Sequence, residues 1–213
     1  MINLTSDYLS NGKAVGWFQG RLEFGPRALG ARSILADPRS DKMQKNLNLK
    51  VKFRESFRPF APSVLREDLT DWFEINVDSP YMLLVADINP KKKIEMTSEQ
   101  KNFFGIDKLN IKRSEIPAVT HVDYSARVQT VTKKNNIRYY DLISKFKEKT
   151  GCAVIVNTSF NVRGEPIVNT PTDAFNCFMG TGIDMLVIGN CILYKEDQDA
   201  EPNQSYENNF ALD

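Results

Sequence analysis

The order of strand-like and helix-like segments most constrains what this 213-residue chain can fold into. Short β-branched and aromatic runs bounded by Gly, Pro or Asp indicate single strands at 14–20, 33–38, 81–88 and 152–157, and pairs of strands within 117–131 and 184–195. Apolar residues at helical spacing indicate helices at 40–50 and 136–151, and an N-terminal capping pattern indicates a helix from Thr170 onward. Because these elements do not alternate regularly as βαβ units, we expect an α/β (α+β) fold with a mixed β-sheet.

Composition along the chain indicates one domain with two polar segments. Residues 1–195 are expected to form a single domain, because this length suits one hydrophobic core. Residues 89–114 are polar and lysine-rich, which is typical of a surface insertion. Residues 196–213 contain six acidic side chains and no Lys or Arg, so we expect an acidic, disordered tail.

Charge and cysteine usage exclude several classes of protein. The formal net charge is +1 at pH 7, so no overall positive field favours nucleic acid. The three cysteines form no CxxC pair and there is one histidine, which argues against a disulfide framework and against a metal site. No apolar run approaches the roughly 18 residues of a membrane span. We therefore expect a cytoplasmic protein with no membrane segment and no metal site of its own.

The first candidate site is the segment GRLEFGPRALGARS at residues 20–33. It holds Arg21, Arg27 and Arg32 among three glycines and a proline. Arginine suits planar, bidentate recognition of phosphate or carboxylate, and glycine lets the backbone approach such a ligand closely. The alternative is that each arginine pairs with a surface acid. For the set together, an anion site is favoured, with Arg27 beside the rigid Pro26 as the main candidate.

The second candidate site is KVKFRESFRPF at residues 50–60, in which cations alternate with apolar residues. On an extended chain Lys52, Arg54 and Arg58 would share one face, with alternate residues about 6–7 Å apart. A row of like charges repels itself unless an anion lies among it. The alternative is an edge strand that lysine protects from aggregation. Arginines and aromatic residues beside two prolines make that alternative weaker here.

The third candidate site is VIVNTSFNVRGEPIV at residues 154–168. A buried strand ends there in a polar turn, and ligand sites of α/β sheets lie where strands end. Asn and Ser offer both donors and acceptors to phosphate, ribose or amide groups. The alternative is a turn that satisfies only its own backbone. The turn presents Asn157, Ser159, Asn161 and Arg163, and a smaller fourth candidate, the strand SARVQTV, presents Arg127.

Four stretches in this order resemble the C-terminal, YrdC-like domain of NodU/CmcH-family O-carbamoyltransferases. They are GRLEFGPRALGARSILADPR, KFRESFRPFAPSVL, ARVQTV and NTSFNVRGEPIV, within about residues 15–193. The resemblance implies a YrdC/Sua5-like twisted mixed β-sheet flanked by helices. It implies that the domain binds carbamoyl phosphate and ATP, with Mg²⁺ accompanying ATP, and forms carbamoyl adenylate. Transfer to an acceptor hydroxyl would then need a Kae1-like N-terminal domain, in cis or in trans, which would hold iron.

The resemblance also implies roles for individual residues. Members of the YrdC group use a Lys-x-Arg pair with a Ser-x-Asn pair, which match Lys52-x-Arg54 and Ser159-x-Asn161 here. We expect catalytic roles for Lys52, Arg54 and Arg58. We expect substrate or nucleotide binding by Arg27, Arg127, Asn157, Ser159, Asn161 and Arg163.

Two other functions are compatible with the same resemblance. One is an RNA-binding YrdC-like module, although the near-zero net charge argues against nucleic acid as a partner. The other is a non-catalytic docking domain for a Kae1-like partner. A homodimer is also possible.

Overall fold

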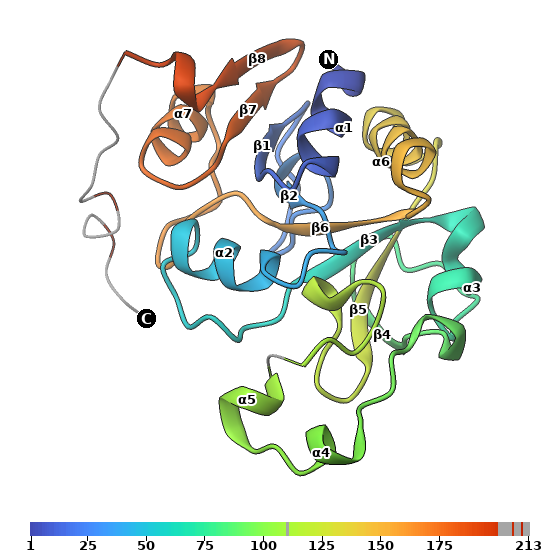
Figure 1. The fold of residues 1–213 in the computed structure, drawn as a ribbon. Helices are drawn as coiled ribbons and strands as arrows, with labels where there is room; N and C mark the ends of the chain where they lie inside the picture. Colours follow the sequence, from blue (N-terminus) through green and yellow to red (C-terminus); the bar gives the residue numbers. More distant parts are fainter. Residues whose placement is uncertain (110, 200–205, 207–209, 211–213) are drawn as a thin grey trace.

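An eight-stranded sheet lies at the centre of the fold (Figure 1). The computed structural model describes residues 1–109, 111–199, 206 and 210. In spatial order the strands of the described residues are β4-β5-β3-β6-β2-β1-β7-β8. Their bounds are β1 Val15–Phe18, β2 Arg32–Ala36, β3 Ala61–Leu65, β4 Leu84–Asp87, β5 Ser125–Val131, β6 Val154–Ser159, β7 Met185–Ile188 and β8 Cys191–Tyr194. The α-helices are α1 Ile2–Ser10, α2 Met43–Lys50, α3 Leu69–Trp72, α4 Ser98–Lys101, α5 Gly105–Leu109, α6 Ile137–Thr150 and α7 Pro171–Met179.

Strand pairing makes the sheet mixed, as predicted. Strand β1 is parallel to β7, and β3 is parallel to β5, whereas the other neighbouring strands are antiparallel. The predicted α/β fold class is therefore confirmed. This pairing also brings the ends of β1 and β6 to the edge of the sheet at which β2, β3 and β5 begin.

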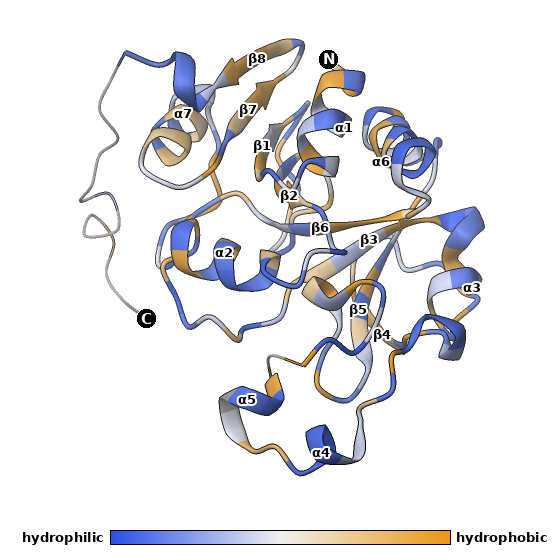
Figure 2. Cartoon of the chain, viewed as in Figure 1, coloured by the Kyte–Doolittle hydropathy of each residue, from blue (hydrophilic) through white to orange (hydrophobic). Residues whose placement is uncertain are grey.

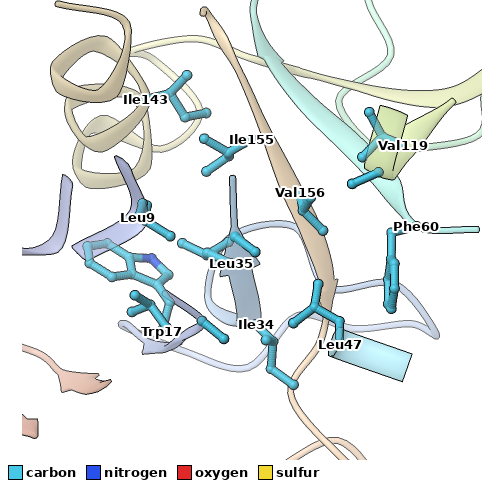
Figure 3. Packing of buried hydrophobic residues seen from close by; sticks show 14 of the residues in the cluster. Leu9, Trp17, Ile34, Leu35, Leu47, Phe60, Val119, Ile143, Ile155 and Val156 are labelled. Atoms are coloured by element: carbon cyan, nitrogen blue, oxygen red, sulfur yellow. The ribbon is translucent and has the colours of Figure 1, made fainter. Parts of the chain in front are cut away.

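Each strand contributes alternate side chains to two apolar layers. On one face Leu35 and Ile155 lie toward Leu9 of α1 and Ile143 of α6 (Figure 3). On the other face, their neighbours along the strands, Ile34 and Val156, lie toward Leu47 of α2 and Phe60 (Figure 3). Figure 2 shows the matching pattern, with hydrophobic residues along β6 and hydrophilic residues on α4. The sheet is thus covered on both faces.

Helix ends follow the local signals in the sequence. Asn136 caps α6 by accepting a hydrogen bond from the Tyr139 backbone N–H, and Gly151 ends it in the left-handed conformation. The Thr170 hydroxyl accepts from the Asp173 backbone N–H and the Asp173 carboxylate accepts from that of Thr170, which forms a capping box at α7.

The prediction of two strands within 117–131 was wrong, because only β5 forms there. Pro117–Val119 forms a 3₁₀ turn instead. The Thr120 hydroxyl donates to the Ile116 carbonyl at 2.9 Å and lies 2.7 Å from the Ser114 hydroxyl, so local side-chain bonds replace ladder bonds.

The predicted extended row at 50–60 was also wrong. Residues 51–60 form turns, and Phe53 has a positive φ of 47°. Strand β3 begins only at Ala61. The cations of this segment consequently do not share the face of a strand.

Two predicted surface segments have the following structure. Within 89–114, the described residues form the short helices α4 and α5, and an isolated bridge joins Lys93 to Ser114. In the predicted acidic tail, Tyr206 is buried and Phe210 packs against the core. The other residues of this segment from 200 onward, 200–205, 207–209 and 211–213, lie outside the described residues. No helix in the described part of the chain is long and apolar enough to cross a membrane.

Candidate functional site

The predicted site residues gather at one end of the sheet. There β1 and β6 end and β2, β3 and β5 begin, so three connections meet: 19–31, 51–60 and 160–168. These connections, the end of β6 and the first residues of β5 carry every residue predicted from the sequence. Segments far apart in the chain are thus brought together by the topology of the sheet.

Lys52 is buried behind the turn that follows β6. Its side chain is 4 % exposed, and Nζ donates to Asn161 Oδ1 and Asn161 O at 2.9 Å each and to Ser159 Oγ at 3.2 Å. Burial and, secondly, the charge of Arg54 lower the pKa of Lys52 to about 7, despite these oxygen partners. Lys52 therefore positions the turn that carries Ser159 and Asn161.

A cavity of about 410 Å³ opens in front of this turn, and we call it the arginine pocket. Its lining includes Lys52, Arg54, Arg58, Ser159, Asn161, Arg163 and Glu165. Both motifs that matched the Lys-x-Arg and Ser-x-Asn pairs therefore meet in one cavity. Among the described residues of this lining the cations outnumber the single carboxylate, Glu165, so the cavity is suited to an anion.

Arg54 is held rigidly at the arginine pocket. Its Nε donates to Asn48 Oδ1 at 2.7 Å, and its guanidinium lies 5.0 Å from the centre of the Phe60 ring. Burial and, secondly, the charge of Arg58 lower the pKa of Arg54 to about 10. Because a lowered arginine pKa means that the charge is poorly solvated here, a bound anion would be stabilised strongly.

Arg58 is a more exposed member of the same group. Its Nε lies 3.0 Å from Glu55 Oε2, and both side chains are nearly half exposed. An exposed ion pair of this kind contributes little to stability, so a phosphate can replace the carboxylate at small cost.

Arg27 and Arg127 form a second cationic pair. Arg27 is exposed on the 19–31 loop, and Arg127 lies on β5. Arg127 Nε is buried and has no hydrogen-bond partner among the described residues. Burial and the charge of Arg27 lower the pKa of Arg127. Neither arginine is among the described residues that line the arginine pocket.

Asn157 lies beneath the site and not in it. It is 1 % exposed, and its Nδ2 donates to Gln129 Oε1 at 2.8 Å and to the Ala28 carbonyl at 3.0 Å. Gln129 Nε2 in turn donates to the Leu29 carbonyl at 2.9 Å. Asn157 therefore holds the 19–31 loop by a hydrogen bond to the backbone of that loop. The binding role predicted for Asn157 stays a prediction, which this geometry does not favour.

The opening loop is held by one glutamate and one arginine. Glu23 Oε1 accepts from the backbone N–H groups of Leu29 at 3.0 Å and Ala31 at 2.6 Å. Arg32 is 4 % exposed, donates to the Gln19 carbonyl at 2.9 Å and stacks 3.4 Å from the Phe18 ring centre. Arg32 is therefore an anchor of the loop, whereas Arg27 stays at its surface.

Sequence reasoning missed Asn48, which organises the 51–60 loop. It is fully buried, and its Nδ2 donates to the carbonyls of Ser56 at 3.0 Å and Arg58 at 2.8 Å while its Oδ1 accepts from Arg54. The available signal was an amide beside Leu47 on the buried side of the 40–50 helix, because a buried amide is rare unless it is hydrogen-bonded.

Comparison with known proteins assigns the chain to a family. A sequence model described as the carbamoyltransferase C-terminus matches residues 6–195. The chain belongs to this family. Nodulation protein NolO of Bradyrhizobium diazoefficiens is 43% identical over 193 residues, which cover 89% of this chain and 32% of NolO. The 3'-hydroxymethylcephem-O-carbamoyltransferase of Amycolatopsis lactamdurans is 37% identical, with 87% of this chain and 31% of the relative covered.

One solved structure shows the same fold as this carbamoyltransferase C-terminal domain. Full-length HypF in a phosphate- and nucleotide-bound form has a TM-score of 0.52 at 17% identity, covering 88% of this chain and 20% of HypF. The membership in the NodU/CmcH family that the sequence predicted is confirmed. The chain spans about a third of the length of the curated relatives it matches.

Proposed function

We propose that this domain binds carbamoyl phosphate and MgATP and forms carbamoyl adenylate, the activated group for an O-carbamoyltransferase. The observation that carries the proposal is the arginine pocket, in which Lys52, Arg54, Arg58 and Arg163 surround one cavity. Carbamoyl phosphate and ATP are both polyanions that repel each other in water. At an effective dielectric of about 20, unit charges about 4 Å apart interact by roughly 4 kcal/mol, so several cations offset that repulsion.

The proposed reaction has two steps, and each of them breaks one bond of a substrate. Water cleaves carbamoyl phosphate into carbamate and inorganic phosphate. A carbamate oxygen then attacks the α-phosphorus of ATP, the bond between the α- and β-phosphates breaks, and pyrophosphate leaves. The products are therefore carbamoyl adenylate, pyrophosphate and inorganic phosphate. Positioning the two reactants and stabilising charge are what the protein contributes.

Within this scheme each group has a distinct role. Arg54 and Arg58 contact the reacting phosphates, and Ser159 and Asn161 hold phosphate or ribose with their polar atoms. Lys52 positions that Ser-x-Asn turn from behind. Arg27 and Arg127 bind carbamoyl phosphate where it enters. Arg163 contributes to the same pocket.

The residues of this domain suit Mg²⁺ only as an ion that the phosphates of ATP already hold. Among the described residues, no group of three His, Cys, Asp or Glu side chains could hold a metal ion. Mg²⁺ is commonly held by substrate phosphates and water, which needs no such group. Iron does not fit this donor set, so we assign it to a Kae1-like half outside this domain.

Transfer to the acceptor hydroxyl belongs, in this proposal, to that Kae1-like half. The relatives are about three times as long as the matched region, which leaves room for such a domain in cis. We place the domain in the cytoplasm, where the free cysteines Cys152, Cys177 and Cys191 would stay reduced.

Isothermal titration calorimetry of the 213-residue chain with MgATP tests the proposal. We expect Arg54→Gln with Arg58→Gln to weaken binding at least about tenfold, because charge-assisted hydrogen bonds to phosphate contribute about 1.5–3 kcal/mol each. The matched control is Lys133→Gln with Lys134→Gln, which removes the same charge beyond the opposite end of β5. Equal losses in both double variants, or no loss in either, would contradict the assignment.

A further inference from the structure

Tyr206, which follows the last strand of the sheet, contacts a residue that lines the arginine pocket. It is 7% exposed, and its hydroxyl donates to Glu165 Oε1. Burial and, secondly, the bond to Glu165 raise the pKa of Tyr206, so the hydroxyl keeps the proton that it donates. No step of the reaction proposed above uses Tyr206, and the sequence model of the family ends before it, at residue 195.

The ring of Tyr206 packs against the end of α7. Gly180, which follows this helix, has a φ of −82°, so its backbone does not require glycine. A Cβ at Gly180 would nevertheless collide with the Tyr206 ring. Phe210 adds an edge contact, with the two ring centres 5.4 Å apart. Gly180 thus leaves room for the ring, and the packing holds the Tyr206 hydroxyl in a fixed place beside Glu165.

Glu165 connects Tyr206 to the turn that follows β6. Its second carboxylate oxygen, Oε2, accepts from the Val162 backbone N–H at 2.7 Å. Its backbone carbonyl accepts from Asn161 Nδ2 at 2.6 Å. The bond from Tyr206 therefore orients a carboxylate that itself closes this turn.

The same turn places the polar side chains assigned to the nucleotide. Asn161 Oδ1 accepts from the Ser159 hydroxyl at 2.7 Å, in addition to the bond from Lys52. Because Asn161 uses Nδ2 for Glu165 and Oδ1 for Ser159, the orientation of its amide is fixed. A displacement of Glu165 would consequently be transmitted to both Asn161 and Ser159.

We propose that Tyr206 is a positioning residue of the arginine pocket. It holds Glu165 and, through Glu165, the turn that presents Ser159 and Asn161. Binding groups keep a productive geometry when hydrogen bonds from neighbouring residues lock their conformation. This inference rests on the proposed function, which supplies the ligand, and it adds a residue that itself does not touch that ligand.

Titration calorimetry of the 213-residue chain with MgATP tests this role. Tyr206→Phe removes the hydroxyl and keeps the ring beside Gly180, so the variant should fold, which its thermal unfolding curve will show. We expect the affinity for MgATP to fall about three- to tenfold, which is the range of one lost hydrogen bond. The matched control is Tyr140→Phe, because the Tyr140 hydroxyl also donates to a glutamate, Glu67. Neither of these two is among the described residues that line the arginine pocket, so this variant should bind MgATP like the wild type.

A second background separates positioning from a purely structural role. In Glu165→Ala, Tyr206 has no carboxylate to hold, so Tyr206→Phe should cause no further loss of affinity. A tyrosine that only stabilised the fold would lower the fraction of chains that bind. The titrated stoichiometry would then fall while the dissociation constant stayed the same.

The outcomes distinguish this inference from the proposed function. If Tyr206→Phe binds MgATP like the wild type, or if it weakens binding equally with and without Glu165, the positioning role is wrong while nucleotide binding stands. An equal loss in Tyr140→Phe would also overturn it. If the wild-type chain does not bind MgATP, the proposed function fails and the positioning role fails with it.

Discussion

At the scale of single residues, two opposing influences act on the pKa of Lys52. Four oxygen atoms surround its Nζ and favour the charged form, while burial and the adjacent Arg54 lower its pKa to about 7. A buried lysine with a pKa near physiological pH changes its charge in response to small changes in its surroundings. A phosphate in front of Ser159 and Asn161 would favour the protonated state.

This lowered pKa predicts how stability depends on pH. The unfolded chain keeps Lys52 protonated up to about pH 10.4, whereas the folded chain releases the proton above about pH 7. Between these values the unfolded state binds more protons, so the free energy of unfolding gains up to about 1.4 kcal/mol per pH unit from this group as pH rises. Urea unfolding of the wild type and Lys52→Met at pH 7 and pH 9 measures it. An equal pH dependence in both proteins would contradict the burial of this lysine's charge.

At the scale of elements, the 19–31 loop is shaped by close contact with α6. Gly30 has a φ of 107°, and a Cβ at this position would lie 2.5 Å from the Tyr139 ring. Glycine is therefore required both for the backbone conformation and for the approach of the ring. The loop that presents Arg27 is thus fixed to the core by packing as well as by hydrogen bonds.

Replacing Gly30 and a control glycine separates the free-energy cost of overpacking from the cost of backbone strain. We expect Gly30→Ala to lower the free energy of unfolding by more than about 2 kcal/mol, since backbone strain and overpacking each cost about 1–3 kcal/mol. Gly12→Ala is the matched control, because Gly12 also has a positive φ but no atom within 4 Å of its Cβ position. Urea denaturation of both variants measures the difference, and equal losses would contradict the packing against Tyr139.

Elements set by local signals could be predicted from the sequence, and those set by distant contacts could not. Asn136 and Gly151 bound α6, and Thr170 caps α7, because capping involves residues only three or four positions apart. Residues 117–131 resembled two strands, but hydroxyl bonds at Thr120 replaced the first.

The same distinction applies to the site. Clusters of arginine and polar residues indicated three loops that the structure brings to one end of the sheet, because residue type alone suggests anion binding. The burial of Lys52 depends on Ser159 and Asn161, more than a hundred positions away, and no local pattern shows it. Asn157 looked like a ligand residue because it ends a strand, yet its amide is used by Ala28 and Gln129.

At the scale of the whole molecule, this domain spans about a third of the length of its curated relatives. One end of the sheet gathers the arginine pocket and the Arg27–Arg127 pair. In the proposed function, a domain with this arrangement activates a small anion with a nucleotide and does not hold the acceptor. The proposal therefore separates activation, which this chain would carry out, from transfer, which it would not.

The most direct test of this account is whether the 213-residue chain releases pyrophosphate from ATP only when carbamoyl phosphate is present, with AMP formed as water hydrolyses the carbamoyl adenylate. Quenched samples resolved by anion-exchange chromatography would show both products together with inorganic phosphate. We predict formation that requires carbamoyl phosphate and is lost in Arg54→Gln with Arg58→Gln, but retained in Lys133→Gln with Lys134→Gln. Binding of ATP without any carbamoyl-phosphate-dependent AMP, or full activity in the pocket variant, would contradict the account.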